Sequence, residues 1–264
     1  MKVTYSDMCL VLGYNGQIIQ APINQRQKKK KEAKLAKAIA GVQTASLEQQ
    51  AFTSLMNPHF MFNALNSIQH YINAQDRQNA NRYLSDFASL IRKNFEAAQK
   101  SFIPLEEEIE NIKVYLRLEQ MRFNERFSYQ IRIDENLDIE DWMVPTMILQ
   151  PLLENALLHG MMPSALEGEL LIQLKLEDGN LIIMISDNGI GIENSMALKE
   201  IGGHRSRGME LIKKRITALS RFGTRAIAIS MSPAFESEKN PGNKIILFVP
   251  TELHKAWLNA QNQK

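Results

Sequence analysis

The chain has 264 residues, of which 44% are hydrophobic, and a formal net charge of +2. This length allows one large domain or two small ones, and the near-neutral charge gives no indication of nucleic-acid binding. The single cysteine, Cys9, excludes a disulfide framework and a CxxC metal site, which is typical of a protein from a reducing compartment.

The first part of the chain carries little structural information. Residues 1–24 lack a signal-peptide cleavage pattern, and no apolar run in the chain approaches the roughly 18 residues of a membrane span. Residues 25–40, QRQKKKKEAKLAKAIA, are strongly basic, and a solvated helix surface is the first interpretation. Membrane proximity of segment 26–37 is the second, since each Lys near anionic lipid contributes about 1 kcal/mol. Nucleic-acid binding ranks third because no aromatic residues are interleaved.

Residues 54–69 read SLMNPHFMFNALNSIQ, a helical pattern that contains a proline, Pro58. A proline inside a helix costs roughly 3 kcal/mol and bends the helix, so the position needs compensation, and function is one candidate. Two stripes at helical spacing run along this segment. The apolar seam consists of Leu47, Ala51, Ser54, Pro58, Met61, Leu65, Ile68 and Ile72, and the polar stripe consists of His59, Asn63, Asn66 and His70.

A second helix is predicted directly after this segment. NAQD, at residues 73–76, is typical of a turn, and apolar residues then recur at helical spacing from Ala80 to Phe95. Two helices with so short a connection form an antiparallel hairpin. Because a lone hairpin has too little core, we expect it to pair with a second copy into a four-helix bundle.

From residue 101 onward, strands and helices alternate. Pro104 followed by three glutamates predicts a helix start, and Asp178-Gly179 between alternating runs predicts a β-hairpin. Strands on one side with helices between them predict an α/β sandwich. The expected elements are a strand at FSYQIRI, a buried helix at VPTMILQPLLENALLHG, the hairpin LLIQLKLEDGNLIIMIS, a helix at about 209–220, and strands near 226–231 and 244–249.

Two short segments of this second half carry polar residues among apolar ones. ENALLHG places Glu154, Asn155 and His159 in an apolar helix, where an unpaired buried amide costs on the order of 1 to 3 kcal/mol. ISDNGIGI ends an apolar strand with Asp187. Taken singly, the first segment is explained by satisfied core residues and the second by an Asx turn.

Together and in this order, the segments resemble the LytS-type sensor histidine kinases. That family carries a phosphoacceptor motif close to NPHFxFN, then ENAxxHG and DNGxG boxes, and the resemblance extends over residues 25–250 with PGNKIILFVP as the closing strand. It implies an α+β fold, in which a dimeric helical-hairpin (four-helix bundle) phosphoacceptor domain precedes an α/β sandwich ATP-binding domain of the GHKL (Bergerat) type. The implied limits are 1–24 for an uninformative segment, 25–100 for the helical domain, 101–254 for the ATP-binding domain and 255–264 for a tail.

For the chemistry, the resemblance implies that an imidazole nitrogen of His59 attacks the γ-phosphate of ATP. With an ordinary pKa near 6.5, roughly three-quarters of such imidazoles are neutral at pH 7. Pro58 would then be a local bend that exposes His59, whereas the bland alternative is a histidine that caps a kink. Many other histidine kinases carry an acidic residue next, but Phe60 stands here. Asn63, one turn on, would therefore orient the imidazole through a hydrogen bond.

For the phosphates, the resemblance implies that Asn155 coordinates the Mg²⁺ ion that bridges them, with Glu154 and His159 near the ion or the phosphates. The family often has Lys in its ENAxKHG box, where this chain has Leu158. This departure removes one positive charge and leaves the affinity for ATP open.

For the base, the resemblance implies that Asp187 accepts a hydrogen bond from the adenine amino group and that Gly189 and Gly191 make room for the ring. Ser206 and Gly208, in GGHRSRGMEL, match the second glycine-rich box, where backbone N–H groups at a helix start hold phosphate.

The predicted function is therefore that of a sensor histidine kinase of a two-component system, with ATP and Mg²⁺ as cofactors. Its partners would be a second copy of the chain and a response regulator, with the LytTR class as a candidate, and no nucleic acid. The predicted location is the cytoplasm, with the cytoplasmic portion of an inner-membrane sensor as a second candidate.

Two other functions are weighed against it. The first is a non-catalytic dimeric docking scaffold with a degenerate nucleotide site, for which Leu158 is the best argument. The second, an ATP hydrolase of the same fold, is less favoured because hydrolytic relatives carry a carboxylate where Pro151 stands. The absence of GxxxxGK[ST] excludes a P-loop mechanism.

Overall fold

The computed structural model describes most of the chain from residue 58 onward. The described residues are 8–12, 18–22, 58–100, 102–164, 166–195, 216, 227–236, 240–252 and 254. Contacts divide the chain into two units, residues 1–49 and 50–264. In the first unit, β1 (Met8–Leu12) and β2 (Ile18–Pro22) form an antiparallel ladder, in a segment for which the sequence predicted no element.

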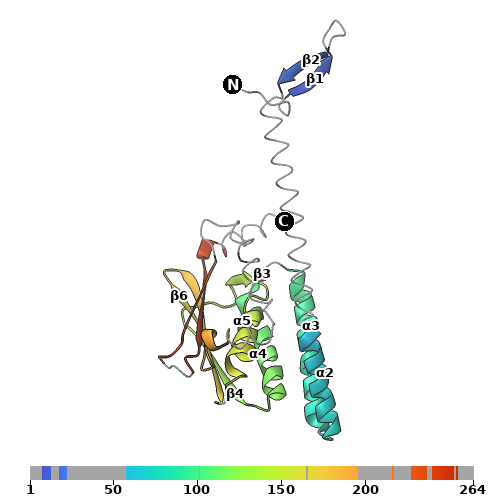
Figure 1. The fold of residues 1–264 in the computed structure, drawn as a ribbon, viewed down its shortest axis with the longest axis vertical. Coiled ribbons are helices and arrows are strands. Elements are labelled where there is room, and N and C mark those ends of the chain that lie inside the picture. Colours follow the sequence, from blue (N-terminus) through green and yellow to red (C-terminus); the bar gives the residue numbers. More distant parts are fainter. Residues whose placement is uncertain are drawn as a thin grey trace. The chain divides into compact units, whose positions relative to one another are not determined.

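The second unit starts with a helical hairpin. Helix α2 (Pro58–Asn73) and helix α3 (Arg77–Ala98) lie side by side (Figure 1). Asp76 ends the turn between them, and its side chain accepts a hydrogen bond of 3.0 Å from the backbone N–H of Asn79, which caps α3. The predicted turn and second helix are therefore confirmed.

The hairpin packs against a third helix, α4 (Leu105–Arg122), through a face that differs from the predicted seam. Phe60 and Ala64 of α2 are buried, whereas Leu65 and Ile72 of the seam are exposed. Ile68 of the seam packs against the core of the chain, so only part of the described seam is left exposed.

Helix α4 begins as the sequence predicted. Pro104 stands at its N-cap, and three glutamates occupy its first turn, where they complement the positive end of the helix dipole. Strand β3 (Phe102–Pro104), just before α4, pairs antiparallel with strand β5 (Met143–Pro145).

The main sheet has five strands in the order β4-β6-β7-β9-β8. Only the β4–β6 pair is parallel. Asp178 and Gly179 have φ of +47° and +74°, as a two-residue hairpin turn between β6 and β7 requires, so the predicted hairpin is confirmed. The strands are β4 (Phe127–Ile133), β6 (Gly168–Glu177), β7 (Asn180–Asp187), β8 (Ala228–Ser232) and β9 (Asn243–Val249).

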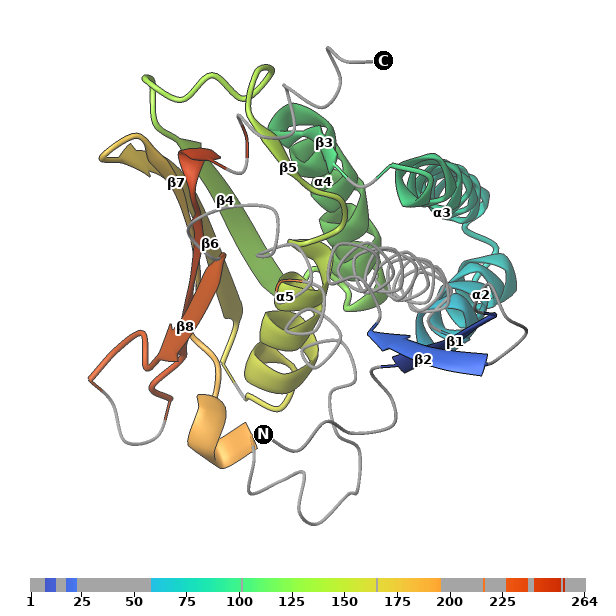
Figure 2. The ribbon, with the colours of Figure 1, turned by 90° about the horizontal axis from the view of Figure 1, so that it is seen from above.

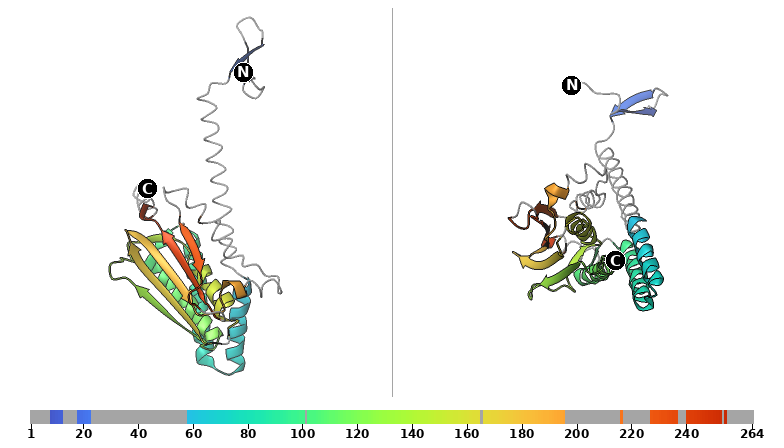
Figure 3. Two further views of the ribbon diagram at one scale, coloured as in Figure 1. Left: turned by 60° about the vertical axis from the view of Figure 1, so that its left-hand side comes forward. Right: turned by 60° about the horizontal axis from the view of Figure 1, so that its bottom comes forward.

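Helices cover one face of this sheet. Figure 2 shows α4 together with α5 (Gln150–Asn155) on that face, and η2 (Ala156–Met161) continues α5 as a π-helix. In the two views of Figure 3, these helices lie between the sheet and the hairpin. The helical hairpin and the α/β sandwich predicted from the sequence are both confirmed.

The helix predicted over VPTMILQPLLENALLHG is wrong in its first third. Val144 pairs with Ile103 in the β3–β5 ladder, and the chain then turns through Met147, whose φ is +58°. The residue before a proline favours extended backbone, which explains why Val144, just before Pro145, is in a strand. The helical residues begin at Gln150.

Some predictions concern segments that lie outside the described residues. The basic segment 26–37 lies outside the described residues, as does the predicted helix at 209–220 apart from Ile216. The predicted domain limits stay predictions. Among the helices that the structure describes, none combines the length and the apolar character of a membrane span.

Candidate functional site

The first part of the candidate site is the start of α2. Pro58 is the first residue of α2, a position where proline is well tolerated, and His59 follows it in the first turn. The side chains of both residues, and residues 51–57, lie outside the described part, so the predicted kink and exposure of His59 stay predictions. Asn63 lies one turn further along α2 and is half-buried.

Phe60, directly after His59, anchors this end of α2. Its ring centroid lies 6.1 Å from that of Phe87 on α3 and 5.8 Å from that of Tyr115 on α4. Aromatic pairs at such distances add about 0.5 to 1.5 kcal/mol to the burial of their surfaces. Phe60 therefore has a structural role, because it fixes the start of α2 against α4.

The second part of the site surrounds Asp187, which ends β7 and is only 1% exposed. Its Oδ1 accepts hydrogen bonds from the backbone N–H of Gly189 at 2.9 Å and from the backbone N–H and Nδ2 of Asn243 at 3.3 and 3.4 Å. Burial raises the pKa of Asp187 to about 6, although these hydrogen bonds lower it. Its Oδ2 is buried and has no hydrogen-bond partner in the described part of the chain.

A buried acceptor without a partner is costly, because its desolvation is not compensated. The Oδ1 atom of Asn243 is a second such acceptor beside Asp187. Its amide orientation follows from the neighbouring carboxylate, since Nδ2 has to face Asp187 for a hydrogen bond to form. The site thus offers two adjacent residues with unused acceptor atoms, which suits a ligand that carries N–H donors.

Glycines allow the backbone to close around Asp187. A Cβ on Gly160 would lie 2.8 Å from Asp187 Oδ1, and a Cβ on Gly189 would lie 2.2 Å from the carbonyl of Gly160. Gly191 has φ of +83° and lies against Pro241, where a Cβ would be 2.4 Å from Cγ. Gly189 and Gly191 are therefore needed for packing of the DNG loop, and their predicted contact with a base stays a prediction.

Sequence reasoning missed two residues of this site, Gly160 and Asn243. Asn243 is paired directly with Asp187 in the β7–β9 ladder. Gly160 belongs to the segment ENALLHG, and Asn243 belongs to the segment PGNKIILFVP. The register between two strands that are far apart in the sequence was the signal needed to bring them to Asp187, and one sequence does not supply it.

The third part of the site is the helix formed by α5 and η2. Leu152, Leu153, Ala156 and Leu157 are fully buried, whereas Glu154, Asn155, Leu158 and His159 are half-buried. The polar residues therefore lie away from the packed face of the helix. The switch from α- to π-helix falls directly after Asn155, and such switches are frequent at functional sites.

Glu154 lies in the electrostatic field of α4. Its negative charge raises the pKa of Tyr115 and of Glu119, although burial is the larger cause for both residues. Burial raises the pKa of Glu119 to about 7. Arg122, whose Nη2 lies 2.5 Å from Glu119 Oε2, acts in the opposite direction and lowers this pKa. Helix α4 thus presents a buried pair of ionisable side chains, Glu119 and Arg122, which sequence patterns did not indicate.

The remaining predicted residues, Ser206 and Gly208, lie outside the described part of the chain. Within that part, no group of three or more His, Cys, Asp or Glu side chains is arranged to hold a metal ion. Asn155 stays the predicted metal ligand.

Comparison with known proteins gives two family matches in chain order. Residues 47–127 match the family described as histidine kinase. Residues 141–253 match the family described as histidine kinase-, DNA gyrase B- and HSP90-like ATPase. The first match covers the helical hairpin and α4, and the second runs from β5 to β9, with most of β4 between the two.

Individual relatives agree with these matches. The sensor protein LytS of Oceanobacillus iheyensis is 37% identical over 142 residues, 53% of this chain and 24% of the relative. LytS of Bacillus cereus is 30% identical over 209 residues, 78% of this chain and 34% of the relative. A solved histidine kinase domain from Erythrobacter litoralis EL346 is 14% identical with a TM-score of 0.43, covering 79% of this chain and 97% of that one, a likeness too low to carry an argument. The chain thus spans about a quarter to a third of the curated relatives' length.

Proposed function

Because the chain belongs to the LytS-type histidine kinase family, we propose that it transfers the γ-phosphoryl group of ATP to its own His59 and then to an aspartate of a response regulator. In the first step, a P–N bond forms between an imidazole nitrogen of His59 and the γ-phosphorus, and the P–O bond to the leaving ADP breaks. Asn63 would orient the imidazole from one turn further along α2.

The observation that carries this proposal is the unpartnered Oδ2 of Asp187. It is a buried carboxylate oxygen at the end of β7, next to the closely packed glycines of η2 and of the DNG loop. The N6 amino group of adenine is a donor that would satisfy it, whereas O6 of guanine would face it as a second acceptor. The site thus supports ATP as the nucleotide.

We further propose that Asn155 is the protein ligand of a Mg²⁺ ion bound with the nucleotide. Mg²⁺ is usually held by one or two protein oxygens together with phosphate oxygens and water, so a single amide oxygen at this place fits its requirements. When bound, the ion neutralises charge on the phosphates. Glu154 and His159 would face the same end of the nucleotide, and Ser206 and Gly208 would bind phosphate.

We also propose a homodimer formed through the hairpin. Phe62, Leu65 and Ile72 of α2 lie on one helix face, and Leu84 and Phe95 of α3 lie on another, and all five are exposed. An amphipathic helix pair with an uncovered apolar face is stabilised when a second copy covers it.

The second proposed partner is a response regulator, with the LytTR class as the candidate. It would receive the phosphoryl group from His59 in the cytoplasm. Segment 26–37 would lie near the membrane.

Titration calorimetry tests nucleotide binding directly. We expect Mg·ATP to bind and Mg·GTP to bind more weakly by about 10⁴-fold, since buried polar contacts discriminate on that scale. Asp187→Ala should lose ATP affinity and remain folded, because Asp187 contributes little apolar packing. Glu193→Ala, at an exposed position in the helical residues that follow the same loop, is the control and should bind ATP as the parent does.

The scaffold function gives the opposite result. A parent chain that binds neither nucleotide at millimolar concentration would exclude the kinase function. It would also show that Leu158, in place of the family's Lys, marks a degenerate site.

A further inference from the structure

The turn that leads into α5 is held more firmly than a surface loop. It runs from Thr146 to Leu149, and Met147 within it has φ of +58°, a conformation that non-glycine residues rarely adopt. Leu149 is the N-cap of α5, and its side chain supplies no capping hydrogen bond. The backbone N–H groups of this turn therefore depend on partners from elsewhere in the fold.

Glu108 supplies those partners from α4. Its side chain is 1% exposed, its Oε2 accepts a hydrogen bond of 2.9 Å from the N–H of Met147, and its Oε1 accepts one of 3.0 Å from the N–H of Leu149. Both carboxylate oxygens thus serve one turn, across 39 and 41 residues of sequence. A carboxylate with two backbone N–H donors forms stronger bonds than a neutral acceptor, so it fixes the place where α5 begins.

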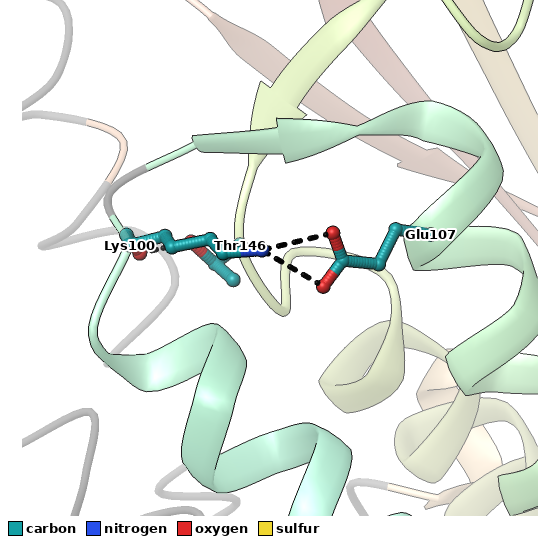
Figure 4. Close-up of polar contacts among 3 residues, drawn as sticks. All are labelled: Lys100, Glu107 and Thr146. Atoms are coloured by element: carbon teal, nitrogen blue, oxygen red, sulfur yellow. Dashed lines mark hydrogen bonds and ion pairs between the residues drawn. The ribbon is translucent and has the colours of Figure 1, made fainter.

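The hairpin contacts the same turn from its other side. Thr146 Oγ1 donates a hydrogen bond of 2.5 Å to the carbonyl of Lys100, two residues beyond the end of α3. Figure 4 shows this contact together with Lys100 Nζ, which lies 3.2 Å from Glu107 Oε2. Glu107 therefore binds the end of the hairpin, and the adjacent Glu108 binds the turn at the start of α5.

The other end of the α5–η2 helix has a separate anchor. The N–H of Ile190 in the DNG loop donates a hydrogen bond of 3.0 Å to the carbonyl of Gly160, near the end of η2. This anchor lies beside Asp187, whereas the anchor made by Glu108 lies at the opposite end. Asn155 lies between the two, five residues after Gln150 and five before Gly160.

We propose that Glu108 is a positioning residue for the nucleotide site, which holds the start of α5 so that Asn155 faces the metal-bound phosphates. This inference rests on the proposed binding of Mg·ATP. A positioning residue acts through the geometry of another group, and small displacements of such a group have large effects on binding. Loss of Glu108 should therefore affect the metal and phosphate end of the nucleotide, whereas the base contacts at Asp187 keep their own anchor.

The test compares Glu108→Gln with Glu106→Gln, an exposed glutamate in the same helix turn. Gln offers one acceptor where Glu offers two, so one N–H of the turn loses its partner. Calorimetry on the full chain measures ATP affinity with Mg²⁺ and in EDTA. We expect Glu108→Gln to weaken Mg·ATP about tenfold and ATP in EDTA less than twofold, as one misplaced ligand implies. Glu106→Gln should change neither.

Two results would overturn the assignment. Equal losses under both conditions would mean that Glu108 only stabilises the fold, and no loss under either would mean that α5 keeps its place without it. Should Glu108→Gln not fold, Glu108→Asp keeps both oxygens but shortens the side chain, and the same pattern is expected. A parent chain that binds no ATP at all would instead overturn the proposed function, and this inference with it.

Discussion

The helical hairpin and the sandwich bury their apolar side chains in different ways. Of the eight large apolar side chains that are exposed in the described residues, five lie on α2 and α3. The sandwich, by contrast, covers one face of its sheet with α4 and α5, and Ile172, Leu174 and Leu247 are fully or almost fully buried. The sandwich therefore closes its own core, whereas the hairpin presents an apolar surface that a partner would cover.

The polar residues of the candidate sites in the two regions also differ in how far they are buried. Asp187 and Asn243 carry buried acceptors that have no partner among the described residues of the sandwich, and such acceptors suit a small ligand. The polar stripe of the hairpin carries Asn66 and His70 on the exposed surface of α2. The proposed function assigns nucleotide binding to the sandwich and phosphoryl transfer to the hairpin, and the following predictions test this division.

The largest effect is expected at His59. His59→Gln should abolish labelling by γ-phosphate-labelled ATP, because no other histidine has the flanking motif. Nucleotide affinity should stay unchanged, since the base site lies in the sandwich. His70→Gln is the matched control, because His70 is exposed on the same helix, and it should keep full labelling. Acid-labile label that persists on His59→Gln at the parent's level would show that His59 is not the phosphoacceptor.

A smaller effect is expected at the apolar surface of the hairpin. Leu65→Glu should weaken dimerisation ten- to a hundredfold, since an apolar side chain of this size contributes about 1.5 to 3 kcal/mol when it is buried. The fold should persist because Leu65 is 53% exposed within one chain. Sedimentation equilibrium measures the effect.

His70→Glu is the control for that experiment. It places the same charge at another exposed position of α2, about 140° round the helix from Leu65 and outside the apolar face. Its dimerisation constant should match that of the parent chain. A parent chain that sediments as a monomer at micromolar concentration would contradict the homodimer.

Many strands, turns and helix starts of the two regions were predictable from the sequence, because their signals lie in adjacent residues. Alternation identified β6 and β7, and Asp178-Gly179 identified their turn, because turn chemistry depends on adjacent residues. Asp76 and Pro104, at the starts of α3 and α4, follow the same logic. The motif resemblance found Asp187, which the structure places in a buried site with an unused acceptor.

The rest depends on contacts between distant segments. Val144 belongs to a strand because Ile103 pairs with it, and the apolar pattern around it fits a helix equally well. Glu108 was interpreted only as a first-turn glutamate of α4, although it binds the turn before α5. Neither residue has a periodic or motif context that indicates its partner, so single-sequence reasoning could not find these roles.

The smallest effect concerns Glu119 of α4, which lies in the field of Arg122 on the same helix and of Glu154 on α5. Burial raises the pKa of this carboxyl from 4.5 to about 7, so the folded chain holds a proton between these pH values that the unfolded chain releases. The free energy of unfolding should therefore fall as pH rises through this window, by on the order of 2 kcal/mol for this one group. Asp187, with a raised pKa of about 6, adds a slope of the same sign.

Urea unfolding at pH 5, 6 and 7 separates the two contributions. Glu119→Gln keeps the shape of the side chain and cannot ionise, so its stability should vary less with pH than that of the parent, with the slope of Asp187 remaining. Glu110→Gln is the control on the same helix. Lys113 lowers the pKa of Glu110, so the stability that this pair contributes is lost only as pH falls below about 4.5, outside the tested window. If Glu119→Gln kept the parent's full slope, Glu119 would be ionised throughout, and its ion pair with Arg122 would outweigh the cost of its burial.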